Sequence, residues 1–272
     1  TLFRSIFSTR IAEYHPFKLY LEELPVWDGV DRLAALARRV SRDQLWVKEF
    51  HIWMRGMTAQ WMGVTGSHAN SVAPLLISTE QGYLKSTFCK SLLPPALQRY
   101  YMDKVDLTSQ GHIERRLAEM GLLNLDEFDK YAPTKMPLLK NLMQMASLSL
   151  CKAYQKNYRS LPRIASFIGT SNRKDLLTDP TGSRRFICVL VEYPIDCEGI
   201  DYAQLYAQLK AEILAGEHYW FTKEEETELQ QSNMMFYRQG PVEDVLRSCY
   251  RAAEKGEGCE LLSRSEERRV GK

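Results

Sequence analysis

The stretch from Leu75 to Phe88 reads LLISTEQGYLKSTF and passes from an apolar run, through a short polar turn, into the triplet Lys85-Ser-Thr. The apolar run extends over residues 72–78, and its length and lack of alternation are typical of a strand buried on both faces. Gly82 lies in the turn, where glycine adopts a positive φ at no steric cost. A strand, a tight turn and a helix opened by Lys-Ser-Thr form the arrangement of a phosphate-binding P-loop.

A P-loop holds a triphosphate through backbone N–H groups, a lysine and a hydroxyl. Backbone N–H groups at the start of the helix point at the phosphates, Lys85 reaches the β- and γ-phosphate oxygens, and the Ser86 hydroxyl is a ligand of Mg²⁺. The expected nucleotide-binding residues are therefore Glu80, Gln81, Gly82, Tyr83, Leu84, Lys85, Ser86 and Thr87.

The loop departs from the pattern G-x-x-x-x-G-K-[ST] at both glycines, which Thr79 and Leu84 replace. Leu84 directly precedes Lys85, at a place where the conformational freedom of glycine is normally used. Taken alone, the segment is explained equally well by an ordinary strand–helix turn with an exposed lysine.

A second apolar run, residues 120–125, ends in the adjacent acids Asp126 and Glu127, about forty residues after Lys85. In P-loop ATPases a strand of this kind lies beside the P-loop strand. Its aspartate holds Mg²⁺ and its glutamate polarises the attacking water. Asp126 and Glu127 fit these roles, although acids also follow strands simply as helix caps.

Two further segments complete the pattern. Residues 164–172 read IASFIGTSN and end in Asn172, where an amide senses the γ-phosphate; the alternative is an Asx turn that closes the strand. Residues 179–186 read DPTGSRRF and carry Arg184 and Arg185, whose guanidinium groups suit the developing charge on a phosphate of the same or a neighbouring subunit. A solvated basic pair, or a contact with a nucleic-acid phosphate, is the other interpretation.

Strands that alternate with helices predict an α/β fold with a P-loop NTPase (AAA+-like) core and a mostly parallel central sheet. We expect a helical segment over residues 1–65, the ATPase core over 66–195, a helical segment over 196–250, and a disordered or foreign tail over 251–272. Because the chain begins at Thr1, we expect it to be a piece of a longer polypeptide.

Pattern also predicts individual elements of this fold. A helix is expected over residues 43–62, another over 137–156, and strands over 163–169 and 185–191. The first of these helices carries an aromatic stripe, interpreted as core rather than as a base-stacking surface, that consists of Trp46, Phe50, Trp53 and Trp61.

Capping residues mark helix starts at both ends of the chain. Asp28 or Asp31 is expected to cap a helix near the amino end, and Thr222 with Glu225 has the spacing of a capping box. Arg163, the first residue of the strand expected over 163–169, is interpreted as a solvated charge rather than as a group that faces a neighbour's nucleotide.

Composition narrows the function classes. The net charge is +2, from 36 basic and 34 acidic residues, so any contact with DNA has to come from local basic clusters. Apolar runs such as residues 72–77 are too short to span a bilayer, and no signal segment opens the chain. The 6 cysteines lack metal or disulfide spacing and are interpreted as reduced thiols of a cytoplasmic protein, and the histidines show no metal spacing.

The four motifs EQGxxKSTF, DE, GTSN and DxTGxRRF, in this order and spacing, resemble the virulence-associated protein E family, a branch of the superfamily 3 helicase-like ATPases of phages and mobile elements. The upstream segment that contains HPF, YLEELPVWDG and DRL is similar to the family's segment before the ATPase core. The resemblance covers about residues 10–235. Since the family's P-loop reads GxQGxGKST, the departures at Thr79 and Leu84 bear on turnover more than on the fold.

The resemblance implies ATP and Mg²⁺ as cofactors, single-stranded DNA as a partner, a homo-oligomeric ring that is typically a hexamer, and an upstream primase domain. It implies catalytic roles for Glu127 and Asn172, a positive charge from Arg184 or Arg185, with one arginine acting in trans, and metal ligation by Ser86 and Asp126. Two alternatives remain open. One is a degenerate P-loop protein that binds nucleic acid or partners without turnover, and the other is a P-loop kinase or nucleotidase acting on a small molecule.

Overall fold

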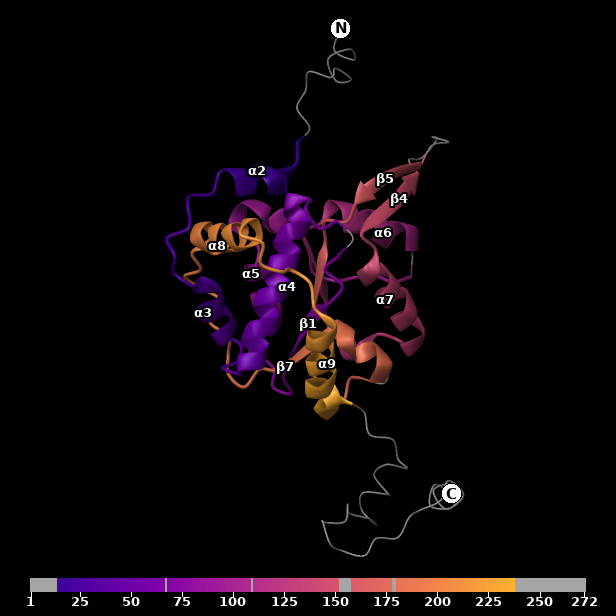
Figure 1. The fold of residues 1–272 in the computed structure, drawn as a ribbon. Helices are drawn as coiled ribbons and strands as arrows, with labels where there is room; N and C mark the ends of the chain where they lie inside the picture. Colours follow the sequence, from indigo (N-terminus) through magenta and orange to yellow (C-terminus); the bar gives the residue numbers. More distant parts are fainter. Residues whose placement is uncertain (1–13, 67, 109, 152–157, 178–179, 238–272) are drawn as a thin grey trace, which may run out of the picture.

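A computed structural model describes residues 14–66, 68–108, 110–151, 158–177 and 180–237 (Figure 1). The tail expected at 251–272 lies outside these residues. The helices are α2 (Pro16–Glu22), α3 (Arg32–Arg38), α4 (Gln44–Met62), α5 (Lys85–Ser91), α6 (Gln110–Glu119), α7 (Met136–Gln144), α8 (Tyr202–Leu214) and α9 (Lys223–Ser232). The strands are β1 (Ala73–Ile77), β2 (Tyr101–Met102), β3 (Leu122–Leu125), β4 (Ser147–Cys151), β5 (Tyr158–Pro162), β6 (Ser166–Ser171) and β7 (Phe186–Leu190). Short 3₁₀ turns span Pro95–Tyr100, Phe128–Lys130, Pro133–Lys135, Pro180–Arg185 and Asn233–Phe236.

The centre of the molecule is a five-stranded sheet of order β2-β3-β6-β1-β7, in which every neighbouring pair is parallel. Strand β1 lies between β6 and β7, with Leu75 opposite both Gly169 and Cys188. The α/β class and the parallel sheet expected from the sequence are therefore confirmed. Because all strands run the same way, their carboxyl ends form one edge of the sheet.

Helices cover both faces of this sheet (Figure 1). One core packs the sheet against α2, α3, α4, α5 and α8, and includes Leu76 and Ile168; the other packs it against α6 and α7, and includes Leu75 and Phe167. Alternate residues of one strand thus enter different cores, which explains why the strands read as continuous apolar runs.

The aromatic stripe of α4 is core, as expected. Trp46 is 2% exposed, and Phe50, Trp53 and Trp61 are 0% exposed. Rings with no accessible surface cannot stack on bases, so the base-stacking interpretation of this stripe is wrong.

The caps expected at both ends of the chain are present. Asp31, one of the two candidates, accepts a hydrogen bond from the N–H of Ala34 at the start of α3. Asp43, which was not predicted as a cap, accepts one from the N–H of Leu45 at the start of α4. Thr222 and Glu225 form a reciprocal capping box at the start of α9. These local signals fix three helix starts independently of the sheet.

The helix expected over residues 137–156 is wrong in its second half. Helix α7 ends at Gln144, and β4 and β5 form an antiparallel hairpin that projects from the body of the molecule (Figure 1). The sequence SLSLC of β4 alternates with a period of two, which is a strand pattern, and Leu148 is buried. Residues 152–156 of the expected helix lie outside the described residues.

Arg163 is buried rather than solvated, which corrects the sequence-based interpretation. It precedes β6 and is 2% exposed. Its guanidinium donates to the carbonyls of Leu142 (3.0 Å), Met143 and Asn70 and to Oε1 of Gln60 (2.9 Å). It joins the end of α7, the segment before β1 and α4, and burial lowers its pKa to about 9.

None of the helices in the described part of the chain combines the length and apolar character that a bilayer crossing requires. Cys89, Cys188 and Cys197 are free thiols, and Cys249 and Cys259 lie outside the described residues.

Candidate functional site

Three side chains that the sequence places after separate strands lie together at the carboxyl edge of the sheet. Lys85 follows β1, Asp126 follows β3, and Asn172 follows β6. These strands are neighbours in the order β3-β6-β1, so their ends adjoin in space. The contacts below show that the three residues form one cluster.

Lys85 is the centre of this cluster. It is 8% exposed, and its Nζ donates to Oδ1 of Asn172 (3.1 Å) and to the carbonyl oxygens of Ser78 (3.3 Å) and Glu80 (3.4 Å). Burial lowers the pKa of Lys85, while the negative charges of Asp126 and Asp129 act in the opposite direction. A buried cation held only by neutral oxygens is positioned to receive an anion.

The loop before α5 has left-handed backbone at two positions although both expected glycines are missing. Gly82 has a φ of 81°, and Leu84 has a φ of 58°, which is the left-handed region that leucine rarely adopts. Of the expected binding residues, Tyr83 is half-buried and Lys85 is buried, whereas those that are exposed are Glu80, Gln81, Gly82, Leu84, Ser86 and Thr87. The backbone thus adopts at Leu84 the conformation for which glycine is normally selected.

Ser86 and Asp126 contact each other directly. The Ser86 hydroxyl donates to Oδ1 of Asp126 at 3.1 Å, and the Thr170 hydroxyl donates to the same oxygen at 2.7 Å. Mg²⁺ prefers hard oxygen ligands and usually takes one or two from protein and the rest from phosphate and water. Ser86 and Asp126 fit that pattern. In the described residues no group of three or more His, Cys, Asp or Glu side chains forms a metal site by itself.

Glu127 occupies a strained turn immediately after Asp126. Its φ is 50°, its N–H donates to the Thr170 hydroxyl (3.3 Å), and its carboxylate is paired with Lys130. The side chain is 40% exposed. A non-glycine residue in this region of φ is kept only where the surroundings require it, and such residues gather at functional sites.

Asp129 belongs to the cluster but was not predicted from the sequence. Its Oδ1 accepts hydrogen bonds from the Ser171 hydroxyl (3.0 Å) and from the N–H of Asn172 (3.4 Å). It therefore fixes the backbone from which the Asn172 side chain reaches Lys85. The sequence does contain one indication of this role: Asp129 lies two residues after Glu127, in a turn that brings it back toward β6.

Arg184 and Arg185 are not part of this cluster within one chain. They precede β7, whose first residue, Phe186, pairs with Ala73 at the amino end of β1. Lys85 follows the other end of β1, about 13 Å away along the strand at 3.3 Å per residue. Arg184 instead lies 3.4 Å from a carboxylate oxygen of Glu226 on α9.

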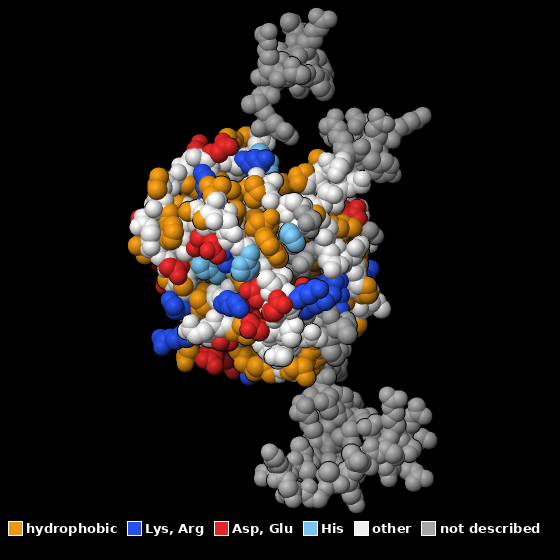
Figure 2. Space-filling model, in the orientation of Figure 1, with side chains coloured by type: hydrophobic (Ala, Val, Ile, Leu, Met, Phe, Trp, Pro, Cys, Tyr) orange, Lys and Arg blue, Asp and Glu red, His pale blue; other side chains and the backbone are white. Residues whose placement is uncertain are grey.

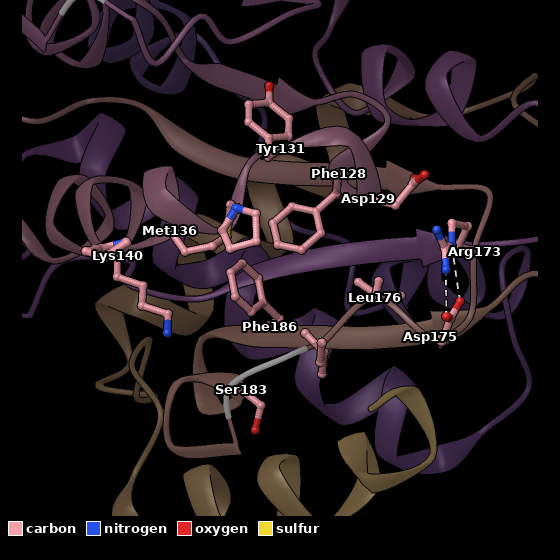
Figure 3. Close-up of a pocket in the computed structure, with 13 residues that line it drawn as sticks. Phe128, Asp129, Tyr131, Met136, Lys140, Arg173, Asp175, Leu176, Ser183 and Phe186 are labelled. Carbon is pink, nitrogen blue, oxygen red and sulfur yellow. Dashed lines mark hydrogen bonds and ion pairs between the residues drawn. The ribbon is translucent and has the colours of Figure 1, made fainter. Parts of the chain in front are cut away.

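A cavity of about 310 Å³ adjoins the acidic strand end, with Phe128 and Asp129 in its wall (Figure 3). Its floor is aromatic, with Phe128 and Phe186 in edge-to-face contact at 4.9 Å, and charged groups line its rim. Among these, Arg173, which follows Asn172 directly, forms a two-point ion pair with Asp175. This cavity was not predicted from the sequence, because its walls come from three separate parts of the chain, residues 128–140, 173–177 and 183–186.

The sheet order and the cluster at its carboxyl edge define a P-loop NTPase-type α/β domain. Residues 21–238 match the model of the virulence-associated protein E-like domain, and the chain belongs to this family. The resemblance drawn from the motifs is therefore confirmed. A comparison with curated proteins found no match.

Solved structures of the NrS-1 C-terminal region are similar in fold. Two apo structures, one of them an A form, each align at 13% identity over 84% of this chain, with TM-scores of 0.49 and 0.50. Another A form apo structure, of residues 305–718, aligns at 15% identity over 80% of this chain with a TM-score of 0.45. The chain spans 45% of that structure and 56% of the other two, which is about half of their length. At this identity the likeness concerns the fold alone.

Proposed function

We propose that this domain binds ATP with Mg²⁺ and hydrolyses it as the helicase-like motor of a mobile-element replication protein that acts on DNA. The observation that carries the proposal is the convergence of three strand ends, in which Lys85 contacts Asn172 at 3.1 Å and Ser86 contacts Asp126 at 3.1 Å. A buried lysine, a hydroxyl beside a carboxylate and an amide in one cluster are the groups that phosphoryl transfer uses.

Phosphate binding follows from the bonds that Lys85 already makes. Its ammonium contacts two backbone carbonyls and one side-chain amide, all neutral. Exchange of these for phosphate oxygens forms charge-assisted hydrogen bonds, which are roughly twice as strong. Ser86 and Asp126 would hold Mg²⁺, which supplies positive charge to the phosphate oxygens.

Hydrolysis requires a water in line with the bond that breaks. Glu127 and Asn172 lie on adjacent strand ends, and in the proposed role Glu127 accepts the proton of the attacking water while Asn172 orients it. Water oxygen bonds to the γ-phosphorus, the bond to the β-phosphate oxygen breaks, and ADP and inorganic phosphate leave. Glu127 has to release Lys130 to act in this way.

Arg184 or Arg185 would act on the site of a neighbouring subunit, since both lie at the opposite edge of the sheet from Lys85. A guanidinium delivered in trans stabilises the charge of the transition state and makes turnover depend on assembly. This supports the homo-oligomeric ring that the family resemblance implies, for which a hexamer is expected.

Contact with DNA is the part of the proposal that rests on family resemblance. The net charge is only +2, and acidic, basic and histidine side chains are interspersed on the face seen in Figure 2. The described residues on that face do not form a one-signed surface that would mark the path of a nucleic acid. DNA-stimulated turnover is therefore the property that separates a motor from a small-molecule kinase.

The proposal is tested by steady-state ATP hydrolysis with and without single-stranded DNA. We expect DNA-stimulated turnover by the wild type and a loss of at least about 100-fold in Lys85→Ala and Glu127→Gln. Light scattering in the same buffer should show oligomers. If the wild type and both variants are equally inactive, the degenerate non-hydrolysing alternative holds. Turnover by a monomer that is indifferent to DNA would favour the kinase.

A further inference from the structure

Leu84 combines a strained backbone with an accessible side chain. Its φ is 58°, and its side chain is 46% exposed. Leucine at positive φ is disfavoured by clashes of its Cβ, and a half-exposed leucine recovers little hydrophobic stabilisation in return. Folding alone therefore does not account for leucine in place of glycine at this position.

The Leu84 side chain faces a specific cavity. Together with Thr87 it lines a cavity of about 440 Å³ between α5 and the segment that follows β7. The other walls are Lys90, Ser91, Gln98, Ile195, Asp196, Cys197, Glu198 and Tyr202. Neither Lys85 nor Asp126 lines it, so the cavity lies beside the cluster around Lys85 and is not part of it. The volume falls within the range of about 300–1,000 Å³ that is typical of ligand pockets.

This cavity is continuous with the phosphate loop. Thr87 follows Ser86 directly, and the N–H of Ile195 donates to the carbonyl of Tyr83 in the loop (3.2 Å). Neither the cavity of Figure 3 nor the one beside Arg38 has a wall from residues 80–87. A triphosphate held at Lys85 therefore has a neighbouring space of sufficient size on the Thr87 side of the loop.

The far wall is held in place by its own contacts. Arg39 donates to the carbonyls of Asp196 (3.1 Å) and Glu198, and the Tyr202 hydroxyl donates to the carbonyl of Ser91 (2.7 Å). Because these bonds tie the segment to α3 and α5, the cavity does not depend on a ligand to form its shape.

We propose that this cavity receives the nucleoside of the bound triphosphate and that Leu84 packs against the base. This inference rests on the proposed function. Leu84 offers apolar surface to a flat ring, and the Gln98 amide offers both a donor and an acceptor. The carboxylates of Asp196 and Glu198 accept hydrogen bonds from ribose hydroxyls. Leu84 stands where the family's loop has glycine, and in this proposal its side chain contributes a contact with the nucleoside.

The test compares two ligands that share a phosphate chain and differ in the nucleoside. Binding of ATP and of inorganic tripolyphosphate, each with Mg²⁺, is measured by calorimetry on the wild type, Leu84→Gly and Gln98→Ala. We expect each substitution to weaken ATP binding about 10-fold, the first by removing apolar contact with the base and the second by removing hydrogen bonds to it. Binding of tripolyphosphate should stay within about 3-fold of the wild type. Leu214→Ala, at an exposed leucine on α8, is the matched control. Circular dichroism verifies that each variant is folded.

Three outcomes overturn the inference and leave the proposed function standing. Equal losses of ATP and tripolyphosphate binding in Leu84→Gly would place the leucine in the phosphate loop alone. Unchanged ATP binding in both variants would show that the cavity holds no nucleoside. A wild type that binds tripolyphosphate as tightly as ATP would contradict the nucleoside contact while leaving the phosphate site intact. Binding of neither ligand by the wild type would instead overturn the proposed function itself, and the inference with it.

Discussion

Lys85 and Asn172 are 87 residues apart in sequence, and the lysine Nζ lies 3.1 Å from the asparagine Oδ1. The bond joins the loop after β1 directly to the end of β6. Asp129 in turn holds the backbone N–H of Asn172 and the Ser171 hydroxyl. The position of the lysine therefore depends on two neighbouring strand ends as well as on its own loop.

Asn172→Ala removes one acceptor from Lys85 and the amide that would orient the attacking water. We expect turnover to fall about 100-fold or more, because a positioned polar group at the transition state is lost. ATP binding should weaken by less than about 10-fold, since Lys85 keeps its other contacts. Steady-state kinetics with a separate binding measurement checks this split. Equal losses in binding and turnover would show that Asn172 serves only to hold the lysine.

The arginine pair predicts complementation between inactive subunits. Lys85→Ala and Arg185→Ala proteins should each be inactive alone, whereas a mixture should regain activity. In mixed assemblies some interfaces join an intact Lys85 site to an intact arginine. ATP hydrolysis across a mixing series is the measurement, and Arg184→Ala tested in parallel shows which arginine acts. A mixture no more active than the sum of its parts would exclude action in trans.

Glu49 on α4 predicts a pH dependence of stability. It is 4% exposed, and burial, assisted by the negative charge of Asp43, raises its pKa from 4.5 to about 8. The stabilising contribution of the protonated form is complete below about pH 4.5 and is lost as the pH rises through 8. Between these values the unfolded state releases the proton and the folded state keeps it, so stability falls by up to about 1.4 kcal/mol per pH unit.

Glu49→Gln should remove most of this slope and stabilise the protein at pH 8. Urea unfolding at several pH values between 5 and 8 checks it. Glu228→Gln, whose carboxylate on α9 is 53% exposed, is the control and should keep the wild-type slope. The same slope in Glu49→Gln and the wild type would show that another group causes the dependence.

Arg163 predicts a large loss of stability. Arg163→Ala leaves the carbonyls of Leu142, Met143 and Asn70 and the amide of Gln60 without their donor in a buried site. We expect a cost of about 3–5 kcal/mol in the free energy of unfolding, with a smaller loss for Arg163→Lys. Arg116→Ala, at an exposed ion pair with Glu119, should change stability by less than about 1 kcal/mol. Denaturant unfolding of the three variants tests this ranking, and equal costs at the two arginines would contradict it.

The sequence predicted the strand ends well because each apolar run stops at a polar residue. Lys85, Asp126 and Asn172 were placed by this rule, and the parallel order of the strands brings them together. Arg184 and Arg185 carry the opposite signal, since they precede a strand and so lie at the other edge. Their position before the strand therefore already indicated that they lie far from Lys85 within one chain.

Other features depend on contacts that no local pattern encodes. Asp129 acts through Ser171 and Asn172, more than forty residues away in sequence. The β4–β5 hairpin was missed because leucine and methionine content was given more weight than the period-two alternation of β4. Arg163 resembled a surface charge because its hydrogen-bond acceptors come from three segments that are distant in sequence. The positive φ of Leu84 is likewise not revealed by the sequence.

The most direct test of the central claim, that three strand ends form one triphosphate site around Lys85, is calorimetric binding of ATP with Mg²⁺ to the wild type and Lys85→Ala. We predict binding by the wild type and a loss of about 100-fold in the variant, from the removal of charge-assisted hydrogen bonds to phosphate. Equal affinity in the two proteins, or no binding by a folded wild type, would contradict it.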